Sequence, residues 1–257
     1  VRDEWKPLWG KRAVVEDHFN ELVIDLVNPA GQPERMQLVV RGYNDGFAFC
    51  YKIPDGKGPC VNVQSELTAY NFAGDYTAWF YNGENHNIGP EKLTETDGTR
   101  LPVMTVKAGD KHYMAIHEAC LETGAPLVLQ SKGGESLFSV ASKPTSLSPG
   151  YTSAWRVVLY GTTPGVLTDS HLLELLNPDP DSRYDFSWVK PGLAVWDWRI
   201  NGAVWDGFTY GMSYPSWVRM VDFAAEQGFK YLVLDANWYG PEFESDSDPV
   251  KGEKAQD

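Results

Sequence analysis

The sequence predicts a mainly β protein in which a large antiparallel sandwich is followed by a single βαβ unit. Three observations support this fold class. Short stretches rich in β-branched and aromatic residues alternate with turn sequences from the start of the chain to about Gly165. The spacing of apolar residues then becomes helical at Thr168, and residues 188–239 follow the order strand, loop, helix, strand.

The first part of the chain contains ten candidate strands separated by turns. Sequences such as Asn44-Asp45-Gly46 and Asp97-Gly98 are competent turns between them. Because many short strands at this spacing bury their apolar faces by packing two sheets together, we expect an antiparallel sandwich. The candidate strands are residues 18–27, 35–41, 47–53, 61–71, 76–81, 101–106, 113–118, 126–130, 136–141 and 154–160.

A short helix and a linker follow the predicted sandwich. Four leucines between positions 172 and 176 lie at helical spacing, Asp169 or Ser170 can cap the helix, and Pro178 ends it. Residues 177–185 are rich in Pro and Asp, a composition that is typical of a linker.

The βαβ unit is predicted from two apolar runs that flank a helical pattern. Residues 192–198 end in Trp-Asp-Trp, and residues 231–234 repeat the pattern of a buried strand. Between them, apolar residues recur at helical spacing, with Ser213 as the N-cap and Gly228 in position to end the helix. The two strands are therefore expected to be parallel.

A carboxylate follows each of the two predicted parallel strands. Asp197 and Asp235 would lie at the C-terminal edge, where α/β barrels place residues that act on substrate, although capping the next loop or helix is the commoner role of such an Asp. A closed barrel takes about 250 residues, whereas only roughly 65 remain from Leu193 onwards. We therefore expect the chain to be a fragment, with an acidic, solvated tail at residues 242–257.

The composition excludes some partners and leaves others open. The chain has 257 residues, of which 42% are hydrophobic, and a formal charge of −13. This charge repels nucleic acids and anionic membranes but does not affect a neutral sugar. No apolar run is long enough to insert into a membrane. The ten Trp and thirteen Tyr residues can stack on sugar rings or fill β-rich cores, and both interpretations fit.

The cysteines and the absence of common catalytic motifs limit the kinds of reaction that are expected of this chain. Cys50, Cys60 and Cys120 have no metal-ligand spacing, and an odd number cannot form a complete set of disulfides, although Cys50 and Cys60 could pair. The sequence lacks the nucleophile motif G-x-S-x-G, a phosphate-binding Gly-rich loop and H-E-x-x-H. Serine hydrolases, zinc hydrolases and nucleotide-binding enzymes are therefore disfavoured.

Several short motifs, in the order in which they occur, resemble glycoside hydrolase family 97, a family of α-glycosidases typical of gut Bacteroidetes. The resemblance covers essentially the whole chain. Its most specific parts are RGYNDGFAF at 41–49, IHEACL at 116–121, AWRVV at 154–158, WVKPG at 188–192, Trp196-Asp197-Trp198, FAA at 223–225 and Leu234-Asp235.

The resemblance implies a β-super-sandwich like that of galactose mutarotase domains, a linking helix, a (β/α)8 catalytic barrel and a small C-terminal β-domain. Residues 1–167 would form the sandwich, 168–187 the linker helix and loop, and 188–257 the incomplete start of the barrel. The implied activity is that of an exo-acting α-galactosidase or α-glucosidase, periplasmic or extracellular, acting on an oligosaccharide or α-glycoside. The catalytic acid and the nucleophile or base would come from the remainder of the same polypeptide.

Calcium in the active-site cleft is a further implication of the resemblance, with Glu118 as the metal ligand that the N-terminal domain supplies. Ca²⁺ takes about six to eight oxygen ligands, so Glu118 would need partners. Without the resemblance, a Glu at a strand end is usually a solvated turn residue. His117, Cys120 and Cys50 stand where Thr, Asp and Arg are usual in the family, and these departures put the calcium ligands in question.

Five residues are candidate substrate contacts: Asp197, Trp198, Asp235, Trp238 and Arg156. The aspartates can accept hydrogen bonds from sugar hydroxyls, and the tryptophans can stack on a sugar ring or belong to the core. Arg156 can bind substrate through two parallel hydrogen bonds or pair with a carboxylate of the sandwich.

Two other functions remain open. A non-catalytic carbohydrate-binding or assembly module would need no catalytic barrel. A mutarotase-like epimerase in the sandwich would need a histidine and a carboxylate in one concave site, and the sequence does not place such a pair.

Overall fold

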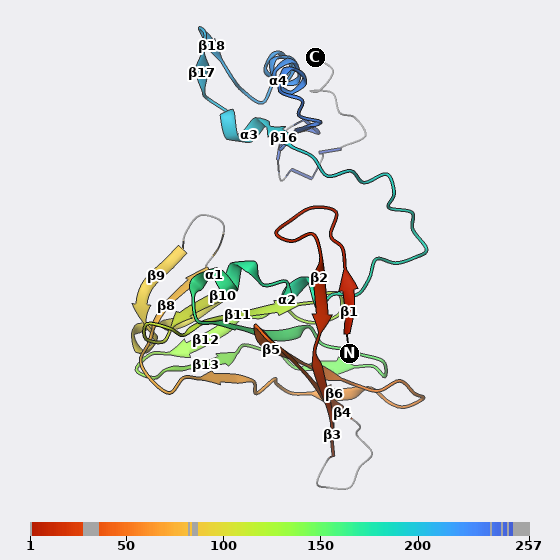
Figure 1. The fold of residues 1–257 in the computed structure, drawn as a ribbon, viewed down its shortest axis with the longest axis vertical. Coiled ribbons are helices and arrows are strands. Elements are labelled where there is room, and N and C mark those ends of the chain that lie inside the picture. The colour runs from red at the N-terminus through yellow and green to blue at the C-terminus, as the bar shows by residue number, and fades with distance from the viewer. Residues whose placement is uncertain are drawn as a thin grey trace. The chain divides into compact units, whose positions relative to one another are not determined.

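The computed structural model describes residues 2–27, 36–81, 83, 87–236, 238–242, 244, 245, 247 and 248. The chain divides into two compact units, Val1–Asp181 and Ser182–Asp257, and each is described by itself. Most of the regular structure is β, as predicted (Figure 1). No helix in the described ranges is long and apolar enough to cross a membrane.

The first unit is built on one large antiparallel sheet. Among the described residues, nine strands follow one another across it, while β8 (Thr77–Tyr81) pairs with β10 and β9 (Asn87–Lys92) pairs with β8. The nine strands, in spatial order, are β3 (Asn20–Leu26), β4 (Met36–Tyr43), β5 (Gly46–Lys52), β15 (Trp155–Gly161), β11 (Tyr113–Ala119), β10 (Asp97–Lys107), β12 (Leu129–Lys132), β13 (Leu137–Val140) and β7 (Ala69–Asn71).

The long strand β10 folds this sheet into a sandwich. Its residues 104–107 pair with β11, whereas its residues 97–100 pair with β12. Side chains from both layers meet in a first core, so the predicted antiparallel sandwich is confirmed. The buried members of this core are Tyr70, Ala78, Phe80, Leu93, Met104, Val106, Ile116, Leu127, Leu129, Phe138 and Val140.

The opposite face of the sheet packs against two short helices, α1 (Pro164–Asp169) and α2 (Leu172–Leu175) (Figure 1). A second core lies here, to which β4, β5, β11 and β15 contribute. Leu172 and Leu176 are buried in it, so these helices belong to the first unit. The boundary after Asp181 falls inside the segment predicted as the linker, residues 168–187.

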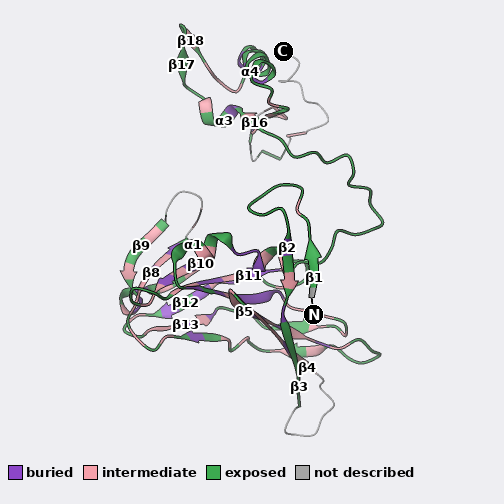
Figure 2. Cartoon of the chain, viewed as in Figure 1, coloured by how far each residue is buried: buried purple, intermediate pink, exposed green. Residues whose placement is uncertain are grey.

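The N-terminal hairpin interrupts a predicted strand. Strands β1 (Arg2–Trp5) and β2 (Val15–His18) pair with each other, and β3 begins after the buried Phe19. Residues 18–27, predicted as one strand, are therefore divided between two sheets. Figure 2 shows the contrast that results: β3 is an exposed edge strand, whereas the central strands β5 and β11 contain buried residues.

The segment 61–71, also predicted as one strand, is divided in the same way. Its first part is β6 (Val61–Val63), which pairs with β14 (Thr145–Leu147), and its last part is β7, which pairs with β13. The alternation of side chains indicates which face a residue occupies but not its hydrogen-bonding partner, so it does not reveal the change of sheet.

The second unit contains the predicted βαβ unit. Strands β16 (Ala194–Trp196) and β19 (Tyr231–Val233) pair in parallel, and helix α4 (Tyr214–Gln227) lies between them in the sequence. A short helix, α3 (Asp197–Ile200), follows β16 directly. The parallel pairing brings the C-terminal ends of β16 and β19 to the same edge.

Helix α4 begins and ends where the sequence predicts. Ser213 is the N-cap residue with an extended backbone, and Gly228 adopts a φ of 72°, the left-handed conformation that ends many helices. Its buried face contains Trp217, Met220 and Ala224, at the predicted helical spacing. The hairpin that precedes it consists of β17 (Val204–Trp205) and β18 (Phe208–Thr209).

Candidate functional site

Glu118 and Arg156 face each other across neighbouring strands of the first unit. Glu118 lies on β11 and Arg156 on β15, and they are direct partners in the antiparallel register. Because side chains alternate along a strand, Glu118 shares the face of Ile116, which belongs to the first core. Both side chains are buried in the sandwich, with 7% of Glu118 and 4% of Arg156 exposed.

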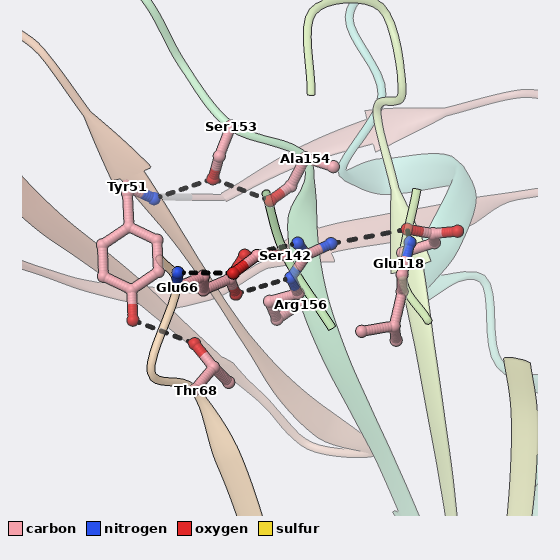
Figure 3. Close-up of polar contacts among 9 residues, drawn as sticks. Tyr51, Glu66, Thr68, Glu118, Ser142, Ser153, Ala154 and Arg156 are labelled. Atoms are coloured by element: carbon pink, nitrogen blue, oxygen red, sulfur yellow. Dashed lines mark hydrogen bonds and ion pairs between the residues drawn. The ribbon is translucent and has the colours of Figure 1, made fainter. Parts of the chain in front are cut away.

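Arg156 is the centre of a cluster of three charged residues (Figure 3). Its Nε and Nη2 donate to Oε1 and Oε2 of Glu66 at 3.0 and 2.7 Å. Its Nη1 donates to Oε2 of Glu118 at 3.4 Å, and the backbone N–H of Leu127 donates to the same oxygen at 2.5 Å. One guanidinium is therefore the shared ionic partner of the buried Glu118 and the partly buried Glu66.

Burial is the largest single influence on the pKa of both Glu118 and Arg156, but it sets the direction of the shift only for Glu118. Loss of water raises the pKa of the Glu118 carboxyl; the Leu127 N–H and Arg156 act in the opposite direction, and Glu66 raises it further. Burial lowers the pKa of Arg156, but hydrogen bonds to Glu66 and the charge of that carboxylate outweigh the burial and raise it overall. Arg156 is thus held in its charged form beside two acidic groups.

The structure brings two predicted site residues together and adds a third. Pairing of Arg156 with a sandwich carboxylate, one of the two possibilities for this residue, is confirmed, whereas its contact with substrate stays a prediction. Glu66 was missed by the sequence analysis. It lies between β6 and β7, 90 positions from Arg156, and the only available signal was that a buried arginine needs an acidic partner.

The surroundings of Glu118 do not by themselves fit a calcium ion. Ca²⁺ takes about six to eight oxygen ligands. The described ranges contain no group of three or more His, Cys, Asp or Glu side chains that could hold a metal. The ionic partner of Glu118 is the Arg156 guanidinium, which repels a cation. A calcium ion at Glu118 would therefore need oxygen ligands from outside the Arg156 cluster.

The residues that depart from the family pattern lie close to Glu118 or in the second core. His117 Nδ1 accepts a hydrogen bond from the backbone N–H of Glu118 at 2.8 Å, and burial lowers the pKa of the imidazole. Cys50, Cys60 and Cys120 are free thiols, so the structure does not contain the Cys50–Cys60 disulfide that the sequence left open. Burial raises the pKa of the Cys50 thiol to about 11.

In the second unit, Asp197 joins the elements of the βαβ unit. It is the first residue of α3, and only 1% of it is exposed. Its Oδ2 accepts a hydrogen bond from the indole Nε1 of Trp217 at 2.9 Å, and its Oδ1 accepts one from the backbone N–H of Asp235 at 3.0 Å. Asp197 therefore connects the end of β16 to helix α4 and to the end of β19.

Asp235 is more accessible than Asp197. It follows β19, is half-buried, and its Oδ2 accepts a hydrogen bond from the indole Nε1 of Trp196 at 2.6 Å. Trp196 also lies under Arg199, whose guanidinium carbon is 4.8 Å from the ring centroid. Both predicted aspartates thus meet at one edge of the βαβ unit, as the parallel strands require.

The predicted tryptophan contacts, Trp198 and Trp238, present accessible rings. Trp198 lies on α3 and is 49% exposed. Trp238 is half-buried and packs edge-on against Tyr239, with ring centroids 5.3 Å apart. The structure brings together Asp197, Asp235 and Trp196. Among the described residues, no side-chain hydrogen bond joins Trp198 or Trp238 to either aspartate.

The Arg156 cluster and the residues around Asp197 and Asp235 can bind and orient polar groups. Neither of these two sets contains a pair of free carboxylates. Arg156 pairs with both Glu66 and Glu118, and both oxygens of Asp197 have partners within the second unit. Among the described residues discussed above, only Asp235 combines a carboxylate at a strand end with an accessible aromatic neighbour, Trp196. The described residues therefore offer sugar-binding groups rather than an acid and a nucleophile.

Comparison with known proteins identifies a family. The family model "Glycosyl-hydrolase 97 N-terminal" matches residues 1–178. A retaining alpha-galactosidase from Bacteroides thetaiotaomicron is 28% identical over 241 residues, covering 77% of this chain and 36% of the relative. A probable retaining alpha-galactosidase from Streptomyces bingchenggensis is 30% identical over 225 residues, covering 80% of this chain and 32% of the relative. The chain spans about a third of the length of these curated relatives.

Solved structures share this fold. A glycoside hydrolase family 97 enzyme from Pseudoalteromonas sp. strain K8 in complex with acarbose matches with a TM-score of 0.76 and 25% identity, covering 95% of this chain and 39% of that chain. The same strain's family 97 enzyme in complex with panose matches with a TM-score of 0.73 and 26% identity, covering 90% and 37%. A beta-arabinopyranosidase matches with a TM-score of 0.69 and 19% identity, covering 91% and 41%.

Proposed function

Because the chain belongs to the glycosyl-hydrolase 97 N-terminal family, we propose that the complete protein is an α-glycoside hydrolase of the retaining α-galactosidase type. The observation that carries this proposal is that the two curated relatives reported above, aligned over 77% and 80% of this chain, are named a retaining alpha-galactosidase and a probable retaining alpha-galactosidase. The related solved structures with acarbose and panose support oligosaccharides as the wider class of substrate.

Retention of configuration sets a geometric requirement for catalysis. It needs two carboxyl groups about 5 Å apart, one that protonates the leaving oxygen and one that attacks the anomeric carbon. The carboxylates described above are occupied by Arg156, Trp217 or backbone N–H groups, apart from the accessible side of Asp235. We therefore assign the catalytic acid and the nucleophile to the remainder of the polypeptide.

The residues of this chain have positioning and binding roles in the proposed enzyme. Asp197 fixes the backbone of Asp235 through a 3.0 Å hydrogen bond, and Trp196 fixes its side chain. Asp235 then accepts a hydrogen bond from a sugar hydroxyl, and the exposed ring of Trp198 stacks on an apolar sugar face. The position of Asp235 after a strand matches the place where α/β barrels put their substrate contacts.

The test compares the complete protein, expressed from its full reading frame, with the 257-residue chain alone. The complete protein is expected to hydrolyse p-nitrophenyl α-galactoside with a higher kcat/KM than the corresponding α-glucoside, and the chain alone is expected to show no turnover. Hydrolysis by the chain alone, at a rate proportional to its concentration, would show that the catalytic residues lie within it.

The alternative of a non-catalytic carbohydrate-binding or assembly module is decided by the same assay. A complete protein that binds α-galactosides but does not cleave them would support that alternative. If the complete protein prefers the α-glucoside, it is still a hydrolase of this family, but its substrate is a glucoside and not the proposed galactoside. An Asp235→Asn variant of the complete protein should have a raised KM, because one contact with the sugar is weakened.

A further inference from the structure

A polar cavity lies in the first unit, apart from the Arg156 cluster. Its volume is about 400 Å³, and residues of the β1–β2 hairpin, the β4–β5 turn and the α1–α2 junction line it. Lys11 ties the hairpin to this junction by donating to the backbone oxygens of Thr168 and Ser170 at 2.8 and 2.6 Å. The volume lies within the range of pockets that hold small molecules.

Polar side chains converge on this cavity. Arg12 comes from the hairpin, Asn44 and Asp45 from the β4–β5 turn, and Asp169 from the end of α1. Within the described ranges, no hydrogen bond or ion pair joins any of these four side chains to another residue. They offer hydrogen-bond donors and acceptors around one space.

His171 provides a buried group that lacks a partner. It lines the cavity, only 5% of it is exposed, and its Nε2 has no hydrogen-bond partner among the described residues. Its Nδ1 lies 3.3 Å from Oε1 of Glu174, and Trp5 packs edge-on against its ring. A buried ring nitrogen without a hydrogen bond is costly, so a ligand hydroxyl placed there would be stabilised.

We propose that this cavity is a binding site for a neutral sugar. Three carboxylates, Glu16, Asp45 and Asp169, against the single guanidinium of Arg12 make the lining acidic, which disfavours an anion. Vicinal hydroxyls both donate and accept, so they match a lining that mixes carboxylates, a guanidinium, an amide and an imidazole. Apolar side chains such as Val14 complete the wall and suit the C–H face of a sugar ring.

The choice of a sugar among neutral polyols rests on the proposed function, whereas the existence of the site does not. The test is a titration of the ¹⁵N-labelled 257-residue chain with methyl α-galactoside, followed by ¹H–¹⁵N NMR. The amides of Asn44, Asp45 and His171 are expected to shift in a saturable manner. No saturable shift, or shifts confined to other segments, would overturn the proposal.

Variants of the cavity residues, with matched controls, test whether Asp45 and Arg12 contact the sugar. Asp45→Ala and Arg12→Ala are each expected to weaken binding about tenfold, since each removes a hydrogen bond of a charged group. The controls Asp110→Ala and Lys143→Ala alter exposed charges elsewhere and should leave the Kd unchanged. Equal affinity of the two pocket variants and the unmodified chain would contradict the proposal.

A second set of ligands separates the sugar from related chemistries. Binding of myo-inositol as tightly as methyl α-galactoside would overturn the assignment to sugars, and tighter binding of ethanolamine would assign the cavity to a cation. The hydrolysis assay on the complete protein is independent of these outcomes. Failure of the sugar site is therefore distinguishable from failure of the proposed enzyme activity.

Discussion

The guanidinium of Arg156 binds both carboxylate oxygens of Glu66, with Nε 3.0 Å from Oε1 and Nη2 2.7 Å from Oε2. The same side chain reaches Glu118 through Nη1. Arg156 is therefore the cationic partner of two carboxylates, Glu66 and the more deeply buried Glu118. Since uncompensated buried charge is costly, the stability of this end of the first unit rests on Arg156.

Arg156→Met is expected to destabilise the first unit by about 3–5 kcal/mol, because it leaves the buried Glu118 and the partly buried Glu66 without a counter-charge. Glu21→Gln breaks the more exposed ion pair with Arg41 and should cost less than about 1 kcal/mol. Calorimetric unfolding of the chain and both variants measures the difference. Equal losses in the two variants would show that the Arg156 cluster is not a major source of stability.

The thiols of Cys50 and Cys60 are expected to differ sharply in reactivity. Burial raises the pKa of Cys50 to about 11. At pH 8 only about one in a thousand Cys50 side chains would then be the reactive thiolate, and this fraction rises about tenfold with each pH unit. Cys60 is exposed. Brief labelling with iodoacetamide at pH 8, followed by peptide mass spectrometry, should modify Cys60 and spare Cys50; rapid labelling of Cys50 would contradict its burial.

Asp197→Asn should destabilise the second unit by about 1–3 kcal/mol. An amide has only one acceptor oxygen, so the Trp217 indole or the Asp235 backbone N–H loses its partner. The control Asp222→Asn changes an exposed carboxylate on α4 and should have little effect. The ¹H–¹⁵N resonance of the Trp217 indole reports the contact directly. Unchanged resonances of both the Trp217 indole and the Asp235 backbone amide in Asp197→Asn would exclude these hydrogen bonds.

Local sequence signals predicted the second unit well. Ser213, Gly228 and the spacing of Trp217, Met220 and Ala224 specify helix α4 within a single stretch of chain. The positions of Asp197 and Asp235 at strand ends followed from the two apolar runs. Their partners did not, because the indole that binds Asp197 lies 20 positions away on α4.

The Arg156 cluster was only partly predictable, for a related reason. Alternation placed Glu118 and Arg156 on strands, but pairing between strands depends on the order of the whole sheet. Glu66 was hidden because residues 61–71 read as one continuous strand, whereas the structure ends β6 at Val63 and begins β7 at Ala69. A side chain in such a connection can point towards a distant strand, and the spacing of apolar residues in the sequence does not reveal this orientation.

Removal of divalent metal should barely affect this chain. A site whose Kd is no lower than the calcium concentration contributes at most about 0.4 kcal/mol, which corresponds to a shift in Tm of about 1 °C or less. The described residues around Glu118 supply too few oxygen ligands for a tighter site. Thermal unfolding in 1 mM CaCl₂ and in EDTA tests this; a difference of several degrees would reveal a calcium site formed by this chain alone.

The stereochemistry of hydrolysis tests the central claim most directly. The complete protein is mixed with p-nitrophenyl α-galactoside, and ¹H NMR identifies the first anomer of galactose before mutarotation. Two carboxylates acting through a covalent intermediate retain the configuration, so α-galactose should appear first. If β-galactose appears first, the enzyme inverts, and the proposed retaining α-galactosidase is contradicted.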